Sequence, residues 1–140
     1  MLNFHTDTCI RFIPSKSTDT DYIDIYKGSG CYSQGVGVQG GKQLVSIGDG
    51  CFHIGIVMHE LMHAAGFWHQ QSRIDRDTFI TVNFSNVIDE GKDQFKKYET
   101  HEASDLQAAY DICSIMHYGP VSFSKNGEPT ITVKDEYKSS

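Results

Sequence analysis

The chain has 140 residues, and 12 Lys plus Arg against 18 Asp plus Glu give it a net charge of −6 with His neutral. Hydrophobic residues make up 39% and charged residues 21%, a composition typical of one globular domain and not of a disordered or fibrous chain. The acidic balance without a basic block argues against a nucleic-acid partner, and the longest apolar stretch, 54–58, is too short to span a membrane.

The first half of the chain is predicted to form short strands separated by turns. In 9–14 alternate apolar residues share one face, and a proline ends the run. In 21–26 two isoleucines alternate with Tyr and Asp, and 43–47 is a third strand candidate that a Gly-Asp-Gly turn closes. A glycine-rich stretch, 28–41, lies between the second and third candidates.

A helix is predicted over 52–65. Its apolar residues repeat at three- and four-residue spacing: Ile54, Val57, Met58, Leu61, Met62 and Ala65. Gly66 is a natural place for the helix to end.

The second half has weaker periodicity. A strand is predicted over 78–84, and 85–98 has the pattern of an amphipathic helix. Irregular structure is expected from about residue 99 onward, with one further strand at 130–133.

The segment 59–69 carries the residues with the clearest chemistry. His59 and His63 are four apart on the predicted helix, so both imidazoles face the same side and can reach one ion. Glu60 lies beside the first of them, in reach of a water molecule near such an ion. Gly66 lets the chain turn sharply, and His69 can then return as a third nitrogen ligand. Three protein ligands and an open position are typical of a catalytic zinc site. The alternative is a buried helix with incidental histidines, which would bury polar groups without partners at a cost.

These residues resemble a known family. The sequence HELMHAAGFWH at 59–69 resembles the long zinc-binding motif of the metzincin metalloproteases. Further motifs narrow the resemblance to the astacin family, and they lie at 9–12, 29–33, 70–77, 80–83 and 114–119. The resemblance runs from about residue 8 to about residue 133.

The resemblance implies an α+β, metzincin-like fold in a single peptidase domain spanning 1–140. A mixed twisted sheet and the active-site helix would form an upper subdomain, 1–69, and a mostly irregular lower subdomain would span 70–140. The family's domain is longer at both ends, so the resemblance implies that this chain is an incomplete domain.

The resemblance also implies roles for individual residues. His59, His63 and His69 would bind one zinc ion, and Glu60 would be the general base and acid. Met116, in the Met-turn, would form an apolar floor beneath the metal. Tyr118 would be an additional zinc ligand that swings away during turnover and then stabilises the oxyanion.

Cysteine pairing is only partly predicted. The resemblance implies a disulfide between Cys31 and Cys51, while a pair of buried thiols is the alternative. Whether Cys9 and Cys113 pair or stay free is left open. Gln70 departs from the family, which usually has Glu at this position linked to the mature N-terminus.

The function that the resemblance implies is a zinc-dependent endopeptidase acting on protein or peptide substrates. The substrate would lie extended along an edge strand around 31–36. An extracellular location is inferred from the family and from cysteine usage, and the oligomeric state is left open. The alternative is a noncatalytic zinc-binding or interaction domain derived from such a protease. The charged segment 73–77 is either a plain surface loop or a structural network.

Overall fold

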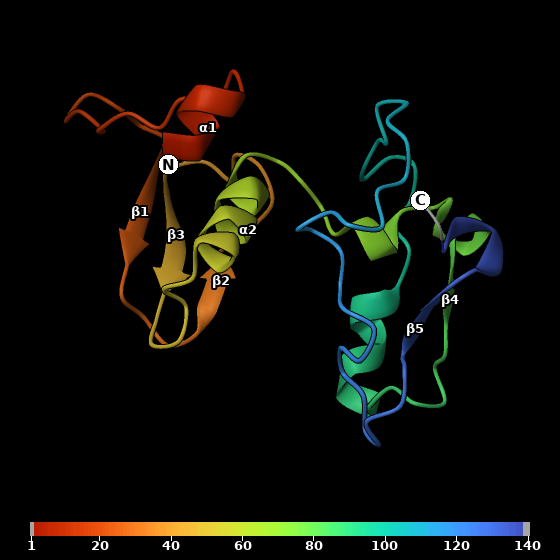
Figure 1. Cartoon of the computed structure of the whole chain (residues 1–140). Helices are drawn as coiled ribbons and strands as arrows, with labels where there is room; N and C mark the ends of the chain where they lie inside the picture. The colour runs from red at the N-terminus through yellow and green to blue at the C-terminus, as the bar shows by residue number, and fades with distance from the viewer. Residues whose placement is uncertain (1, 139–140) are drawn as a thin grey trace. The chain divides into compact units, whose positions relative to one another are not determined.

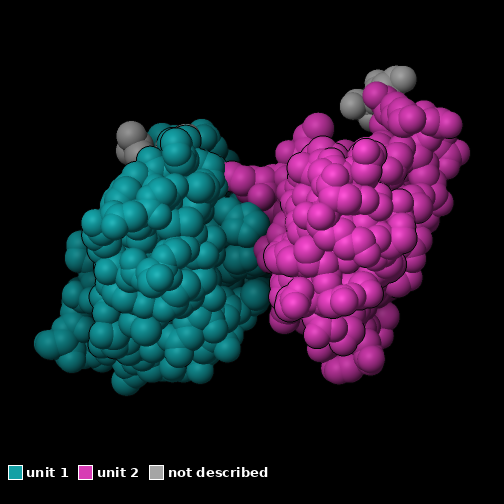
Figure 2. Space-filling view, turned by 90° about the horizontal axis from the view of Figure 1, so that it is seen from below, with its two compact units in different colours: residues 1–67 teal, residues 68–140 magenta. Residues whose placement is uncertain are grey.

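The computed structural model describes residues 2–138 and divides the chain into two compact units, with the boundary between Phe67 and Trp68 (Figures 1 and 2). The first unit contains a mixed sheet and the long helix, and the second is mostly irregular with two short strands. The α+β class predicted from the sequence is confirmed. Among the described residues, no helix combines the length and hydrophobicity that crossing a bilayer requires.

The first unit is built on a three-stranded sheet with the order β1-β3-β2. β1 (Tyr22–Tyr26) runs parallel to β3 (Lys42–Ile47), and β2 (Cys31–Ser33) runs antiparallel to it. A short helix, α1 (Leu2–Asp7), precedes the sheet, and the long helix, α2 (Ile54–Ala64), follows it and contacts β2 and β3 (Figure 1). β2 is therefore an edge strand that lies beside the helix carrying the candidate site.

The core of the first unit lies between β3 and α2. Val45 and Ile47 project from the central strand and pack with Cys51 and Ala64, all of them buried. Ile23, Ile56 and Val57 pack against this cluster. The period of two in β3 and the helical period in α2 thus bury one face of each element against the other.

A disulfide joins Cys31, the first residue of β2, to Cys51, which lies shortly before α2. The two half-cystines are 20 residues apart in the sequence. Cys9 and Cys113, whose pairing the sequence leaves open, are free thiols and both are exposed.

We expect the double substitution Cys31→Ala/Cys51→Ala to destabilise the first unit by about 3 kcal/mol, because the unfolded chain regains the entropy of a loop of this length. Native-state hydrogen exchange of the β3 amides measures the change, with Cys9→Ala as a matched control that breaks no bridge. Equal opening free energies for the double variant and the control would contradict this expectation.

The helix α2 ends in a Schellman motif. The amide of Gly66 donates to the carbonyl of His63 at 2.9 Å, and the amide of Phe67 donates to the carbonyl of Met62 at 3.0 Å. Gly66 has a φ of 105°, and its Cα lies close to Gly37, whose amide also donates to the His63 carbonyl at 2.8 Å. A side chain at residue 66 would be strained at this φ, so glycine is required where the chain leaves the helix.

The second unit has only one pair of strands among its described residues, β4 (Ile80–Val82) and β5 (Ile131–Val133), which are antiparallel. Short 3₁₀ helices make up much of the rest, at Gln70–Ser72, Arg76–Thr78, Asp89–Phe95 and Asp135–Tyr137. Its core is a cluster of Ile80, Val87, Phe95 and Ile131, all of them buried.

Two arginines hold this irregular unit together. The guanidinium of Arg76 is buried and donates to the backbone carbonyls of Gln71, at 2.9 Å, and Phe95. Arg73 makes a two-pronged contact with Asp75, at 2.9 and 2.8 Å, and donates to the carbonyl of Ala108 at 3.0 Å. The segment 73–77 is therefore a structural network and not a plain surface loop.

The long helix lies where the sequence places it, and so do four predicted strands, at 21–26, 43–47, 78–84 and 130–133. Two other predicted elements are wrong. The stretch 9–14 forms no strand, because side chains occupy its backbone donors: the Phe12 amide donates to His5 Nε2 and the Ile10 amide to Thr8 Oγ1. The predicted helix over 85–98 is instead a turn, a bridge between Val87 and Ser124, and a 3₁₀ helix.

Candidate metal centre

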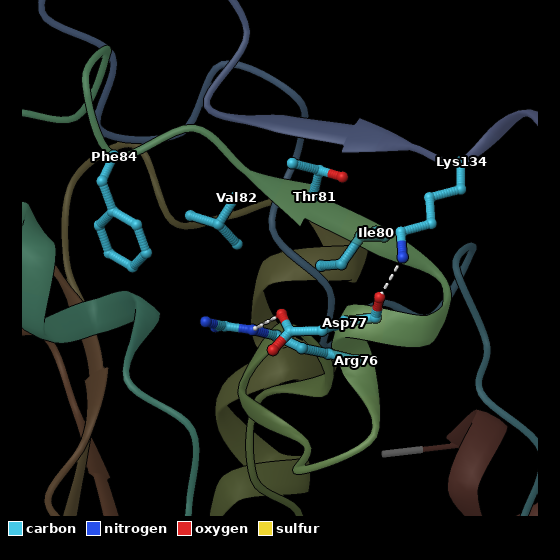
Figure 3. A pocket seen from close by; sticks show the side chains of 7 residues that line it. All are labelled: Arg76, Asp77, Ile80, Thr81, Val82, Phe84 and Lys134. Atoms are coloured by element: carbon cyan, nitrogen blue, oxygen red, sulfur yellow. Dashed lines mark hydrogen bonds and ion pairs between the residues drawn. The ribbon is translucent and has the colours of Figure 1, made fainter.

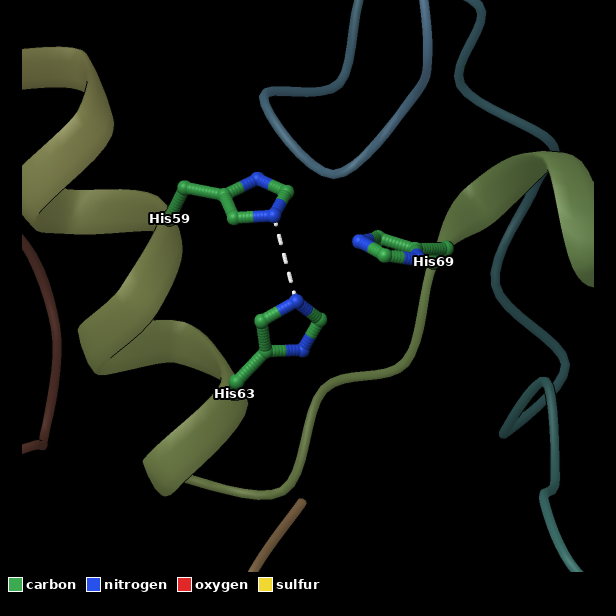
Figure 4. Close-up of side chains that lie close together, drawn as sticks. All are labelled: His59, His63 and His69. Atoms are coloured by element: carbon green, nitrogen blue, oxygen red, sulfur yellow. Dashed lines mark hydrogen bonds between the residues drawn. The ribbon is translucent and has the colours of Figure 1, made fainter. Parts of the chain in front are cut away.

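The helix α2 places two imidazoles one turn apart. His59 and His63 are half-buried, their ring centroids are 4.7 Å apart, and their Nε2 atoms approach to 3.1 Å (Figure 4). Two nitrogens bound to one tetrahedral zinc at ordinary bond lengths would be roughly 3.3 Å apart. The spacing of the two Nε2 atoms therefore already suits a shared ion.

The end of the helix fixes the orientation of the His63 ring. Its Nδ1 lies 2.8 Å from the carbonyl oxygen of Phe67, which only accepts hydrogen bonds, so Nδ1 carries the proton and Nε2 presents a lone pair. Burial also lowers the pKa of the His63 imidazole, which favours the neutral ring that metal binding needs. Both effects prepare Nε2 as a ligand atom.

His69 completes the cluster. One nitrogen from each of His59, His63 and His69 lies within 4.8 Å of the other two, and Figure 4 shows the three rings pointing toward a common point. Tyr98 supports the third ligand, since its hydroxyl oxygen accepts hydrogen bonds from the His69 backbone and the Ser72 side chain. Three imidazole nitrogens, with the tautomer of His63 fixed, are a fitting ligand set for zinc. The three histidines are thus positioned to bind one metal ion.

Glu60 follows His59 in the sequence, and its carboxylate is buried and hydrogen-bonded to the neighbouring strand β2. Its side chain is buried, with 6% of the residue exposed, and the backbone amide of Ser33 on β2 donates a hydrogen bond to its carboxylate. Burial raises the pKa of the Glu60 carboxyl, and the neighbouring His59 charge and the Ser33 amide partly oppose this rise. A carboxylate with a raised pKa is a stronger base than one in water.

The segment 114–118 forms a tight turn within the second unit. The amide of His117 donates to the Ser114 carbonyl at 2.9 Å, and Met116 is buried with 2% of the residue exposed. The amide of Gln70 donates to the Met116 carbonyl at 2.9 Å, which ties the turn to the residue that follows His69.

Tyr118 lies next to the third ligand. Its ring is 4.8 Å from the His69 ring, centroid to centroid, and its hydroxyl lies 3.4 Å from Gln94 Oε1. The buried Gln71 fixes the backbone of this residue, because its Oε1 accepts the Tyr118 amide at 3.1 Å. Of the predicted site residues in the second unit, Tyr118 and His69 are therefore in direct ring contact.

The sequence did not predict the residues that hold the backbone of Tyr118 in place, His117 and Tyr110. The hydroxyl of Tyr110 lies 2.9 Å from Nε2 of His117, whose Nδ1 lies 2.7 Å from the Tyr118 carbonyl. The phenol therefore donates to Nε2 while Nδ1–H donates to the carbonyl. The Tyr110 ring stacks on Phe79 at 4.6 Å, and burial raises the pKa of its hydroxyl. No periodicity in the sequence links these residues.

The remaining histidines are not part of the cluster. His53 is the N-cap residue of α2 without a side-chain capping bond, and His101 is exposed beside Glu99. His5 is also outside the cluster, and its Nε2 accepts the Phe12 amide at 2.8 Å.

Comparisons with known proteins identify the family. The family model described as "Astacin", a family of peptidases, matches residues 1–140. Zinc metalloproteinase nas-13 from Caenorhabditis elegans is 53% identical over 128 residues, which are 91% of this chain and 28% of that protein. Zinc metalloproteinase nas-4 from the same organism is 49% identical over 137 residues, covering 96% of this chain and 42% of that protein.

A solved structure agrees with these relatives. The high choriolytic enzyme 1 from Oryzias latipes, a hatching enzyme zinc-protease, superposes with a TM-score of 0.89 at 40% sequence identity, covering 99% of this chain and 68% of that one. The fold is similar to that of this zinc-protease, and three histidines are positioned to bind one metal ion. The chain belongs to the astacin family of peptidases. It spans between about a quarter and two fifths of the length of the curated relatives it matches.

Proposed function

We propose that this chain carries the catalytic site of an extracellular zinc-dependent endopeptidase. The observation that supports this most strongly is the convergence of His59, His63 and His69, with the buried carboxylate of Glu60 on the same helix as the first two. Zinc in such a site polarises the scissile carbonyl and makes a water molecule acidic enough to attack near neutral pH.

In this proposal Glu60 handles the proton. Its carboxylate accepts a proton from the attacking water and later delivers it to the leaving amine, and its raised pKa suits both transfers. Tyr118, beside His69, is proposed as an additional ligand in the resting state and as a hydrogen-bond donor to the developing oxyanion. Met116 is proposed as the apolar floor of the site.

The substrate is proposed to be an extended segment of protein chain. β2 is the edge strand of the sheet next to α2, and edge strands accept a further strand through main-chain hydrogen bonds. The Ser33 amide donates to the carboxylate of Glu60, the residue proposed as the base, which supports a substrate position at this strand. A peptide laid along β2 would therefore bring its carbonyls close to the proposed base.

An extracellular location is proposed on two grounds. The Cys31–Cys51 disulfide is the kind of bridge that persists in oxidising compartments. The chain is also similar to a hatching enzyme that is a zinc-protease.

The direct test is cleavage of a denatured protein by the purified chain. We expect cleavage with one equivalent of zinc, loss of cleavage below detection after chelation, and recovery when zinc is added back. Activity that is indifferent to chelation would contradict the proposal. Stoichiometric zinc binding without any cleavage would instead support the noncatalytic zinc-binding domain.

A further inference from the structure

The turn that follows β4 carries the tripeptide Asn83-Phe84-Ser85, which has the Asn-x-Ser pattern of an acceptor for N-linked glycans. We propose that Asn83 is an N-glycosylation site that receives an oligosaccharide from a lipid-pyrophosphate donor. The proposal rests on the extracellular route proposed above, because glycans of this kind are added to chains that enter the secretory pathway.

The tripeptide lies in an exposed turn. The amide of Asn86 donates to the Asn83 carbonyl at 3.1 Å, which closes the turn, and the three residues of the tripeptide are all exposed. An N-linked glycan is bulky and needs such a position on the surface. The site thus meets the steric requirement that a buried Asn-x-Ser tripeptide would fail.

The side chains within the turn are arranged for modification. The hydroxyl of Ser85 donates to Asn83 Oδ1 at 2.6 Å, and the Ser85 amide approaches the same oxygen at 3.3 Å. Both contacts are to the oxygen, and within residues 2–138 the amide nitrogen Nδ2 of Asn83 has no hydrogen-bond partner. The nucleophilic nitrogen is therefore unengaged while the oxygen is held by the hydroxyl of the tripeptide.

Two neighbouring asparagines differ from Asn83 both in the hydrogen bonding of the amide nitrogen and in the sequence that follows. Asn86 Nδ2 donates to the Pro129 carbonyl at 2.9 Å, and Asn126 Nδ2 donates to Asn86 Oδ1 at 3.0 Å. Neither is followed two residues later by Ser or Thr. Asn86 therefore provides a matched internal control only three residues from the proposed site.

The glycan transfer is a nucleophilic substitution at the anomeric carbon of the sugar. The bond between Asn83 Nδ2 and the anomeric carbon forms, and the bond from that carbon to the pyrophosphate oxygen breaks. The lipid pyrophosphate leaves with the electron pair of the broken bond, and the proton that the amide nitrogen loses balances the negative charge formed on this leaving group.

A glycan at this position would lie beside a cavity of the second unit. This cavity of about 310 Å³ is lined by Arg76, Asp77, Ile80, Thr81, Val82, Phe84 and Lys134 (Figure 3). Phe84, directly after Asn83, is 43% exposed. The proposed glycan site therefore adjoins a partly exposed aromatic ring that lines this cavity.

The test expresses the full chain behind a secretion signal in eukaryotic cells and treats it with peptide N-glycosidase in ¹⁸O-water. We expect a single-glycan mobility shift and conversion of Asn83 to labelled Asp, located by fragmentation of the tryptic peptide 77–92. Asn83→Gln and Ser85→Ala should both lose the shift, whereas Ser85→Thr and the control Asn86→Gln should keep it.

Unmodified Asn83 in the secreted protein or in the lumenal fraction would overturn the proposal, and so would a shift that survives Asn83→Gln. Zinc content and proteolysis are measured on the same preparation, so failure of glycosylation is distinguished from failure of the proposed function. Asn83→Gln should leave both of these unchanged.

Discussion

Glu60→Gln is expected to bind zinc stoichiometrically and yet to lose peptide hydrolysis by a factor of roughly 10²–10⁴ in kcat, the usual contribution of a general acid–base group. The amide cannot accept the proton of an attacking water. It preserves the volume of the buried side chain, and its oxygen can still accept the Ser33 amide. The fold and the three histidines should therefore be unaffected, and the loss should fall on chemistry alone.

Metal analysis, circular dichroism and steady-state kinetics on one peptide substrate measure this separation. Glu90→Gln is the matched control, because Glu90 is an exposed carboxylate in the second unit. Cleavage by Glu60→Gln at the parent rate would show that another group acts as the base. Loss of zinc from this variant would show that Glu60 supports the ligands and not the proton transfer.

Arg76→Met is expected to lower the free energy of unfolding of the second unit by about 2–4 kcal/mol. The guanidinium is buried, with 5% of the residue exposed, and donates to the carbonyls of Gln71 and Phe95. It also contacts Asp77 at 3.1 Å. Methionine fills a similar volume but leaves two carbonyl oxygens without their donor, and a unit whose described residues form only two short strands has few other bonds to replace them.

Urea unfolding followed by Trp68 fluorescence measures this effect. The chain has one Trp, and its ring lies 4.4 Å from that of Tyr98 in the same unit, so its emission reports on the second unit. Arg11→Met is the control, because Arg11 is exposed and bonds to the nearby carbonyls of Thr8 and Ile10. Indistinguishable unfolding midpoints for the two variants would contradict a structural role for Arg76.

The elements that could be predicted from the sequence are those whose cause is local. The period of α2 and its glycine stop lie within about a dozen consecutive residues, and β3 shows its alternation in the same way. The prediction of a helix over 85–98 was wrong because contacts with residues far along the chain hold this segment. The Ile88 amide donates to the Phe123 carbonyl, and Gly91 packs so closely against Phe123 that a side chain would not fit there.

The same distinction applies to the site. His59 and His63 are related by one helical turn, so their spacing alone predicts that they can bind the same metal ion. His69 needs the Schellman turn and the support of Tyr98, which lies 29 residues further along the chain. Tyr98, Tyr110 and Gln71 support the site through contacts that only the folded chain creates. Nothing in their local sequence distinguishes them from ordinary packed residues.

Hydrogen bonds hold both the backbone carbonyl and the ring of His63, and this affects how the residue binds an ion. Its carbonyl accepts the amides of Gly37 and Gly66, and its ring nitrogen is held by the Phe67 carbonyl. This ligand is therefore preorganised, and little conformational entropy is lost at this residue when a cation arrives. Depletion and reloading should accordingly be a reversible exchange that leaves the scaffold around the helix end unchanged.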